Sequence, residues 1–363
     1  MKVLQVLTHL NIGGIPTYAY TLTKYLLRHK IEVAIASSGG SWEEEFKKLG
    51  ASVFRINIRT KNEFSYKLPI ALYQLLKIKK KFNFEIIHSH TRVTQVLSQV
   101  FSIVSGVAHV GNFHGFYAQN KLRWGRKIFK AHGDISIAIT PQVKHDLIYT
   151  FGAQENKVKL ILSGIDLERL DQASLNFKLA GSPKIGASGR LSSVKGFKYL
   201  IKSMPQLIKS YPDIHLYILG QGKQEQELLA LADSLNIRKN FTILKNINLA
   251  DFLNTLDIFC LPSLQEPLGL SVIEAQYFGI PCVVTDIGGL TILVKNLYTG
   301  LVVPPKDPGA VSKAITTLLE DEILRRKISN RSKRQAKEKF DISQKINQFI
   351  NVYYEAINEI SNI

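Results

Sequence analysis

Short apolar runs rich in β-branched residues alternate along the chain with longer stretches in which apolar residues recur every three or four positions. The short runs predict strands and the longer stretches predict amphipathic helices, and their alternation is typical of parallel βαβ units. Seven strands are predicted in the first half, at residues 3–9, 32–38, 52–58, 85–90, 109–114, 134–140 and 157–163. Six more are predicted in the second half, at 184–191, 214–222, 241–246, 258–263, 281–286 and 300–305.

The alternation is interrupted at residues 164–183, where polar residues, glycine and proline replace the apolar runs. Such a segment is typical of a linker, and 363 residues exceed the roughly 250–300 at which one hydrophobic core stops growing. We therefore expect an α/β protein of two doubly wound, Rossmann-like domains, at residues 1–170 and 171–340. Residues 341–363 form a last amphipathic pattern, and we expect this helix to cross back and pack toward the first domain.

The composition is that of an ordinary globular protein, with 45% hydrophobic and 21% charged residues. No apolar run reaches the roughly 20 residues that cross a bilayer, and the first residues lack a signal-peptide cleavage pattern. We therefore expect a cytoplasmic protein. Cys260 and Cys282 each lie in an apolar run, which favours buried thiols over a disulfide framework or a metal cluster.

The net charge of +18 is unevenly distributed. Residues 1–170 carry 24 Lys and Arg against 11 Asp and Glu, which gives +13, whereas residues 171–363 carry 23 against 18. The excess indicates an anionic partner, such as a phospholipid surface, a phosphorylated glycolipid or nucleic acid, although a basic surface also serves solubility. No recognition motif for nucleic acid accompanies the charge, so nucleic acid is not expected as a partner.

One basic segment of the first half also carries large apolar side chains, among them Ile128 and Phe129. Basic helices with interleaved aromatic residues can lie on an anionic bilayer, whereas an ordinary amphipathic helix would turn its aromatic residues into the core. We expect a protein that binds peripherally at the inner face of the cell membrane. The face that meets the membrane, or a lipid-linked partner on it, is expected to contain Arg123, Trp124, Arg126, Lys127 and Lys130, with further cations at Lys77, Lys79, Lys80, Lys81 and Lys121.

Two glycine-containing loops follow predicted strands, at the edge where ligands of parallel sheets bind. In HLNIGGIPTY, Gly13 and Gly14 either let a ligand approach the backbone at a helix start or form only a tight turn. In GRLSSVKG, Arg190 and Lys195 lie just before a helix start at Gly196. Two cations and a helix dipole acting on one anion would form a diphosphate site, and two solvated loop cations are the alternative.

The segment EPLGLSVIEAQYFGIPCVVTDIGG, which begins at Glu266, places two carboxylates around a helix start. Ser271 and Glu274 fit the capping box S-x-x-E, in which the glutamate satisfies a backbone donor. A capping box leaves Glu266 and Gly269 unexplained. A helix that begins near Gly269 would instead offer free amides to a phosphate, and both carboxylates could accept hydrogen bonds from sugar hydroxyls.

The E-x7-E spacing of this segment closely resembles the donor-site signature of retaining family 4 glycosyltransferases of the two-Rossmann (GT-B) fold. GRLSSVKG resembles the phosphate loop of that family, SGID (163–166) its interdomain turn and IGGI its amino-terminal glycine loop, in the same order along the chain. The resemblance implies two domains facing a central cleft. It also implies transfer of a hexose from a nucleotide-diphosphate sugar, UDP above all, to a glycan or lipid-linked acceptor in cell-surface polysaccharide or lipopolysaccharide synthesis.

The resemblance further implies how the diphosphate is bound. Arg190 and Lys195 would hold it and stabilise it as the leaving group. The backbone amides of Gly269 and Leu270 would face the same phosphate. No metal ion and no other cofactor are expected, because these cations and the helix amino ends can supply the positive charge.

The resemblance also implies which residues contact the sugars. Glu274 would bind the ribose hydroxyls, Glu266 would lie beside the donor sugar, and Gly14 would belong to the glycine loop at the donor. His114, in NFHG at the end of the fifth predicted strand, matches the histidine of the family near the transferred sugar. The two histidines of HSH (88–90) keep a structural interpretation.

Other activities stay open beside this one. A sugar-nucleotide epimerase, a glycogen-synthase-like polymerase or a non-catalytic protein that binds nucleotide sugars would share the diphosphate site. A glycoside hydrolase also uses two carboxylates, about 5 Å apart in retaining enzymes. It has no use for Arg190 and Lys195, and the presence of both cations together with Glu266 and Glu274 favours an active transferase.

Overall fold

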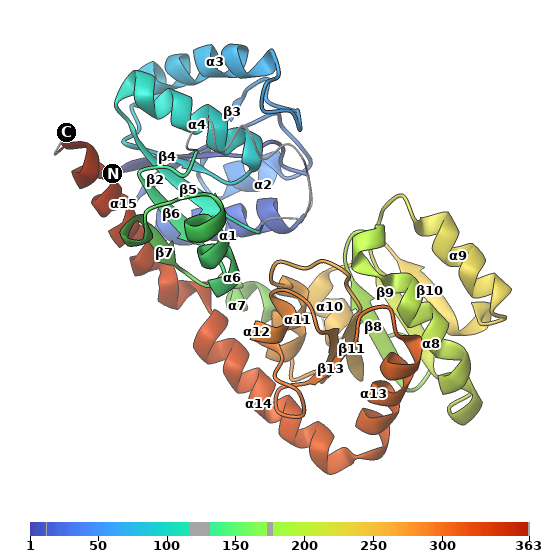
Figure 1. Cartoon of the computed structure of the whole chain (residues 1–363). Helices are drawn as coiled ribbons and strands as arrows, with labels where there is room; N and C mark the ends of the chain where they lie inside the picture. The colour runs from blue at the N-terminus through green and yellow to red at the C-terminus, as the bar shows by residue number, and fades with distance from the viewer. Residues whose placement is uncertain (12, 116–130, 173–176, 362–363) are drawn as a thin grey trace. The chain divides into compact units, whose positions relative to one another are not determined.

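The computed structural model describes residues 1–11, 13–115, 131–172 and 177–361. The chain divides into two compact units, drawn in Figure 1. The first consists of Met1–Gly164 together with Ile342–Ile363, and the second of Ile165–Asp341. Both are α/β units built around a parallel sheet.

The first unit contains a seven-stranded sheet in the order β3-β2-β1-β4-β5-β6-β7. Its strands are β1 (Lys2–Val6), β2 (Glu32–Ser37), β3 (Ser52–Arg55), β4 (Ile86–Ser89), β5 (Ala108–Phe113), β6 (Ile135–Ala138) and β7 (Val158–Leu160). Its helices include α1 (Gly14–Arg28), α2 (Glu43–Lys48), α3 (Lys67–Phe82), α4 (Arg92–Ser105), α6 (Pro141–His145), η1 (Asp146–Thr150), η2 (Glu155–Lys157), η5 (Ile342–Lys345) and α15 (Ile346–Ser361). Every strand predicted in the first half is present.

Successive strand residues of the first sheet enter different cores, as the two-residue period of a strand requires. Val3 belongs to a core that also contains residues of α1 and α15, whereas Leu4 belongs to a core that contains residues of α3 and α4. Phe349 and Tyr353 of α15 are fully buried in the first of these cores. The last helix of the chain therefore completes the hydrophobic core of the first unit.

The second unit contains a six-stranded sheet in the order β10-β9-β8-β11-β12-β13. Its strands are β8 (Lys184–Ser188), β9 (His215–Leu219), β10 (Phe241–Leu244), β11 (Ile258–Leu261), β12 (Cys282–Thr285) and β13 (Leu301–Val303). Its helices include α7 (Leu167–Leu170), η3 (Ser193–Lys195), α8 (Phe197–Ser210), α9 (Glu225–Ser234), η4 (Arg238–Asn240), α10 (Leu249–Leu253), α11 (Leu270–Tyr277), α12 (Leu290–Leu293), α13 (Pro308–Glu320) and α14 (Glu322–Phe340). All six strands predicted in the second half are present.

The registers of both sheets are parallel, including the central pairs β1–β4 and β8–β11. The carboxyl ends of the strands therefore lie along one edge of each sheet, and the loops that carry the candidate residues start there. Cys260 and Cys282 are buried free thiols, and burial raises the pKa of each. Within the described ranges, no helix is both long enough and apolar enough to cross a bilayer.

Candidate functional site

The loop between β8 and α8 folds back over the end of its own strand. Gly196 has a left-handed φ of 63°, and a Cβ atom there would lie 2.1 Å from the carbonyl oxygen of Pro262, so the position requires glycine. A Cβ atom on Gly189 would lie 3.1 Å from Cε of Lys195. The Lys195 side chain thus lies directly over the backbone at the carboxyl end of β8.

A second glycine pair supports this loop from the end of β9. A Cβ atom on Gly220 would lie 2.0 Å from the carbonyl oxygen of Gly189, and one on Gly222 would lie 2.3 Å from that of Leu191. These glycines were not predicted as part of the site. The pattern that indicates them is a pair of glycines, one residue apart, directly after a predicted strand.

The two cations of the loop have different surroundings. Nζ of Lys195 lies 2.5 Å from Oε2 of Glu266, and the two side chains are 19% and 11% exposed. Arg190 is exposed, and its guanidinium group makes no hydrogen bond or ion pair with any residue that the structure describes. Lys195 is therefore held in place by a protein carboxylate, whereas the guanidinium group of Arg190 is exposed to solvent.

Loops from three strands hold Glu266. Oγ of Ser263 donates to Oε2 of Glu266 at 3.4 Å, and the amide of Gly289 donates to the Glu266 carbonyl at 3.1 Å. A Cβ atom on Gly289 would lie 1.9 Å from the carbonyl oxygen of Pro267, so the DIGG loop after β12 packs against this segment. The amide of Leu264 donates to the Val194 carbonyl at 2.7 Å, which joins the loops after β8 and β11.

Helix α11 begins at Leu270, and its N-cap is Gly269 in a left-handed conformation with φ 92°. The capping-box interpretation is therefore wrong, because Ser271 lies inside the helix and no side chain caps its start. Glu274 lies more than one turn inside the helix, too far along to reach back to the N-cap amide. The alternative start at Gly269 is the observed one, and it leaves the first-turn amides without a side-chain acceptor.

The Glu274 carboxylate is buried and contacts Arg169, which lies far from it in the sequence. Its side chain is 8% exposed, and Oε1 lies 3.3 Å from Nη2 of Arg169, on α7. Burial raises the pKa of Glu274 to about 7, although the charge of Arg169 lowers it. Arg169 was not predicted as a site residue, because 105 residues separate it from Glu274 and only the fold brings the two side chains together.

In the first unit, the glycines after β1 are not required by the local backbone. Gly13 has an extended φ of 166°, which any residue adopts, and a Cβ atom on Gly14 would meet no atom within 4 Å. Steric need for glycine therefore does not account for this pair. Gly14 is the first residue of α1, and its backbone is not covered by other atoms on the side to which a Cβ atom would point.

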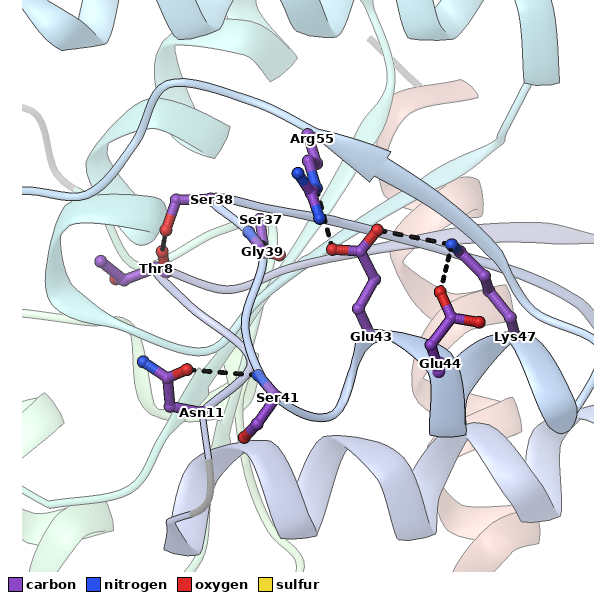
Figure 2. Close-up of polar contacts among 10 residues, drawn as sticks. All are labelled: Thr8, Asn11, Ser37, Ser38, Gly39, Ser41, Glu43, Glu44, Lys47 and Arg55. Atoms are coloured by element: carbon purple, nitrogen blue, oxygen red, sulfur yellow. Dashed lines mark hydrogen bonds and ion pairs between the residues drawn. The ribbon is translucent and has the colours of Figure 1, made fainter.

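The loop after β2 holds the loop after β1 in place, as Figure 2 shows. A Cβ atom on Gly40 would lie 2.4 Å from the carbonyl carbon of Leu10, so the two loops touch through their backbones. Hydrogen bonds between the loops include Leu10 N to Gly39 O (3.0 Å), Ser38 Oγ to Thr8 O (2.7 Å) and Ser41 N to Asn11 Oδ1 (3.3 Å). The Glu43 carboxylate then contacts Arg55 at 2.9 Å and Lys47 at 3.5 Å (Figure 2).

His114 follows β5, is partly buried and belongs to a chain of polar side chains. The Tyr18 hydroxyl donates to Oδ1 of Asn112 at 3.2 Å, so the amide nitrogen of Asn112 faces Nε2 of His114, 2.9 Å away. With the amide assigned in this way, Nε2 accepts from Asn112, and Nδ1 of His90 lies 3.4 Å from the same Nε2 atom. Burial lowers the pKa of His114 to about 3, so the ring is a neutral hydrogen-bond donor near pH 7. Tyr18 was not predicted because it lies far from His114 in the sequence. Asn112 was not predicted because it lies inside a strand.

The five residues of the expected acceptor or membrane face, Arg123, Trp124, Arg126, Lys127 and Lys130, lie outside the described residues. Among the residues that are described, no group of three or more His, Cys, Asp and Glu side chains is arranged to hold a metal ion. The predicted donor residues Arg190, Lys195, Glu266, Gly269, Leu270 and Glu274 all belong to the second unit, whereas Gly14 and His114 belong to the first.

Comparison with known proteins covers both units. Residues 12–169 match the profile of a family described as Glycosyltransferase Family 4, and residues 170–335 match Glycosyl transferases group 1. An uncharacterized glycosyltransferase of Methanocaldococcus jannaschii is 25% identical, over 94% of this chain and 94% of its own. The UDP-Gal:alpha-D-GlcNAc-diphosphoundecaprenol alpha-1,3-galactosyltransferase of Escherichia coli is 26% identical, over 79% of each chain.

A solved structure shares the whole fold. HepE of Anabaena in complex with UDP and glucose has a TM-score of 0.83, at 18% identity, over 98% of this chain and 100% of that one. At this identity the similarity shows the fold alone, that of two Rossmann-like domains in one chain.

Proposed function

Because the chain belongs to the family 4 glycosyltransferases of the GT-B fold, we propose that it transfers a hexose from a UDP-sugar to a glycan or lipid-linked acceptor, with retention of anomeric configuration. The place proposed for this reaction is the inner face of the cell membrane, in the synthesis of a cell-surface polysaccharide or lipopolysaccharide. The galactosyltransferase of Escherichia coli, whose name specifies a UDP-sugar and a diphosphoundecaprenol acceptor, supports this donor and acceptor class.

The observation that carries the proposal is the grouping of positive charge around the loop after β8. The guanidinium group of Arg190 has no partner among the described residues, Lys195 is held by Glu266, and α11 begins in the segment directly after Glu266 with no side-chain cap. A diphosphate that leaves the anomeric carbon gains negative charge, and preorganised donors stabilise this charge without reorganising. Glu274 is proposed to accept hydrogen bonds from the ribose, and Glu266 to lie beside the transferred sugar.

In the proposed reaction, the bond between the anomeric carbon and the diphosphate oxygen breaks, and the acceptor hydroxyl oxygen bonds to the same face of that carbon. The hydroxyl proton passes to the departing diphosphate, so charge and atoms balance. No protein nucleophile is proposed. In the first unit, His114 is proposed to donate from Nδ1 to a hydroxyl of the donor sugar, and the open backbone at Gly14 to lie against the donor.

The direct test is a thermal-shift screen of the full chain against UDP, GDP, ADP and their glucose conjugates, without added metal. A ligand at a hundred times its Kd stabilises the folded state by about 2.7 kcal/mol, so UDP should raise Tm well above the values with GDP and ADP. No shift with any nucleotide would reject the proposal. Conversion of the UDP-sugar to an epimer in the absence of acceptor would instead identify an epimerase.

We expect Glu274 to make stability and donor binding respond to pH in opposite directions. Its pKa is about 7 in the folded state against an ordinary value of 4.5, so between these values the folded protein holds more protons than the unfolded chain. The contribution of Glu274 to the free energy of unfolding therefore falls as pH rises from about 4.5 to about 7. The ionised carboxylate is the better acceptor for ribose hydroxyls, so affinity for UDP-glucose should rise over the upper part of this range.

Glu274→Gln is the matched variant, because it keeps the shape and removes the titration. It should lose the pH dependence of UDP-glucose affinity and bind about tenfold more weakly at pH 8, where one charge-assisted hydrogen bond is lost. Its Tm at pH 8 should equal or exceed that of the wild type. Calorimetric titration measures the affinity for UDP-glucose and thermal melting measures Tm, each from pH 5 to 8. A lower Tm with unchanged affinity would mean that Glu274 has only a structural role.

A further inference from the structure

Helix α3 presents two different faces. Ala71, Leu75 and Ile78 point inward and are buried in the core that α4 also enters. Figure 1 shows α3 along the outer side of the first unit, beside α4. Its opposite face starts with large apolar side chains, of which Tyr66 is 73% exposed, Ile70 42% and Tyr73 59%. These residues recur at helical spacing and therefore form one continuous stripe.

The same stripe continues as a row of cations. Lys77, Lys80 and Lys81 are exposed on the following turns, and Nζ of Lys77 lies 4.5 Å from the ring centroid of Tyr73. The sixteen residues of α3 contain five lysines and no acidic residue. The exposed face of α3 is thus apolar near the start of the helix and positively charged near its end.

We propose that the outer face of α3, formed by Tyr66, Ile70, Tyr73, Lys77, Lys80 and Lys81, docks the protein on a membrane surface rich in anionic phospholipid. Amphipathic side chains such as Tyr occupy the headgroup level, where the ring meets acyl chains and the hydroxyl meets water. Lysine stems extend along the apolar boundary and bring the ammonium groups to the lipid phosphates. The occupant is inferred from this complementarity of charge and apolar surface.

The direction of α3 relates the docking face to the proposed reaction. The helix follows β3 and precedes β4, two parallel strands of the same sheet, so it runs back from the carboxyl edge of the sheet toward the amino edge. Its apolar end, at Tyr66, is therefore the end closer to the edge that carries Gly14 and His114. The inference extends the proposed function, since a lipid-linked acceptor would be presented at the surface on which α3 docks.

The second unit provides a matched control. Helix α14 contains eight basic and two acidic residues, so it is as basic as α3, but its exposed face is polar apart from Ile323. If positive charge alone attracted the lipid, both helices would contribute alike. If lipid binding needs apolar and basic residues together, only α3 should contribute to it.

The experiment compares five forms of the full chain. The two α3 variants are Tyr66→Ser/Ile70→Ser/Tyr73→Ser and Lys77→Ser/Lys80→Ser/Lys81→Ser. The two controls are Lys327→Ser/Lys333→Ser/Arg334→Ser and Ile323→Ser/Tyr354→Ser, which remove exposed side chains of the same kinds elsewhere. Each is sedimented with vesicles of phosphatidylcholine alone or mixed equally with phosphatidylglycerol, at low and high salt, after circular dichroism has established an unchanged fold.

The wild type and both controls should sediment with the anionic vesicles, less at high salt, and much less with phosphatidylcholine alone. Each α3 variant should bind the anionic vesicles at least about tenfold more weakly. Absence of wild-type binding at low salt, or an equal loss in the α14 control, would overturn the proposal. So would retention of an oligonucleotide by the wild type with no binding to vesicles, which would assign the face to nucleic acid.

A parallel thermal shift with UDP separates this proposal from the proposed function. UDP should stabilise all five forms equally, because none of the changed residues belongs to the nucleotide site. If UDP stabilises the protein while vesicles fail to bind it, only the docking face is rejected. If vesicles bind through α3 while UDP and the other nucleotides have no effect, the docking face stands and the transferase function is rejected.

Discussion

Arg190→Ala and Lys195→Ala are each expected to lower kcat/KM for sugar transfer by about a hundredfold to a thousandfold, as the loss of one preorganised donor at a developing negative charge does in other enzymes. Arg190 has no partner among the described protein groups, so its donors are fully available to the diphosphate. Lys195 pairs with Glu266, and in the proposed reaction the departing diphosphate would compete with this carboxylate for the ammonium group. The effect is measured as release of UDP, in the presence of acceptor, from the UDP-sugar that the thermal-shift screen selects.

The two variants should differ in stability, which provides the control. Arg190→Ala should leave Tm unchanged, because the side chain is exposed. Lys195→Ala should lower the free energy of unfolding by about 1–3 kcal/mol, because it leaves the largely buried Glu266 carboxylate without its cation. The double variant Lys195→Ala/Glu266→Gln should recover stability and stay inactive. Near wild-type turnover in either single variant would contradict the diphosphate site.

Glu266→Gln should separate turnover from nucleotide affinity. The substitution keeps the size of the side chain and its contact with Ser263, but it frees Lys195 from its carboxylate at 2.5 Å. UDP should therefore bind as tightly as to the wild type or more tightly, because the charge of Lys195 is no longer compensated. Transfer should fall by about a hundredfold, because the substitution removes the carboxylate that is proposed to lie beside the donor sugar.

Calorimetric titration with UDP and steady-state transfer assays measure these two effects on the same preparation. Parallel losses of UDP affinity and kcat would mean that Glu266 only positions Lys195. An unchanged kcat would remove Glu266 from the reaction. Glu266→Asp is a useful companion, since it keeps the charge and shortens the reach toward Lys195.

The fold was predictable because its signals are local. All thirteen strands begin and end close to the predicted ranges, since each is a short apolar run bounded by polar residues or glycine. The loops GRLSSVKG and EPLGL were found in the same way, because a glycine or a charged residue directly after a strand stands out from the pattern. Which strand lies beside which was not readable from these runs, since β1 pairs with both β2 and β4.

The interpretation of individual site residues was less predictable. Ser271 and Glu274 fit a capping box by spacing alone, and the box failed because Gly269 can adopt a left-handed conformation and start the helix earlier. Gly13 and Gly14 suggested a tight turn, and the backbone there turned out to need no glycine. A local pattern permits several backbone conformations, and the choice among them depends on what the segment packs against.

By itself, the sequence determined the two parallel α/β units, the edge of each sheet at which the loops gather, and the cations of the second unit. The tertiary structure decided the pairing and the protonation of the side chains. Lys195 with Glu266, Arg169 with Glu274, and Asn112 with Tyr18 are each separated by 71 or more residues. Hydrogen bonds, burial and the pKa values that follow from them act over a few ångströms in space, so they depend on which distant segments the packed core places side by side.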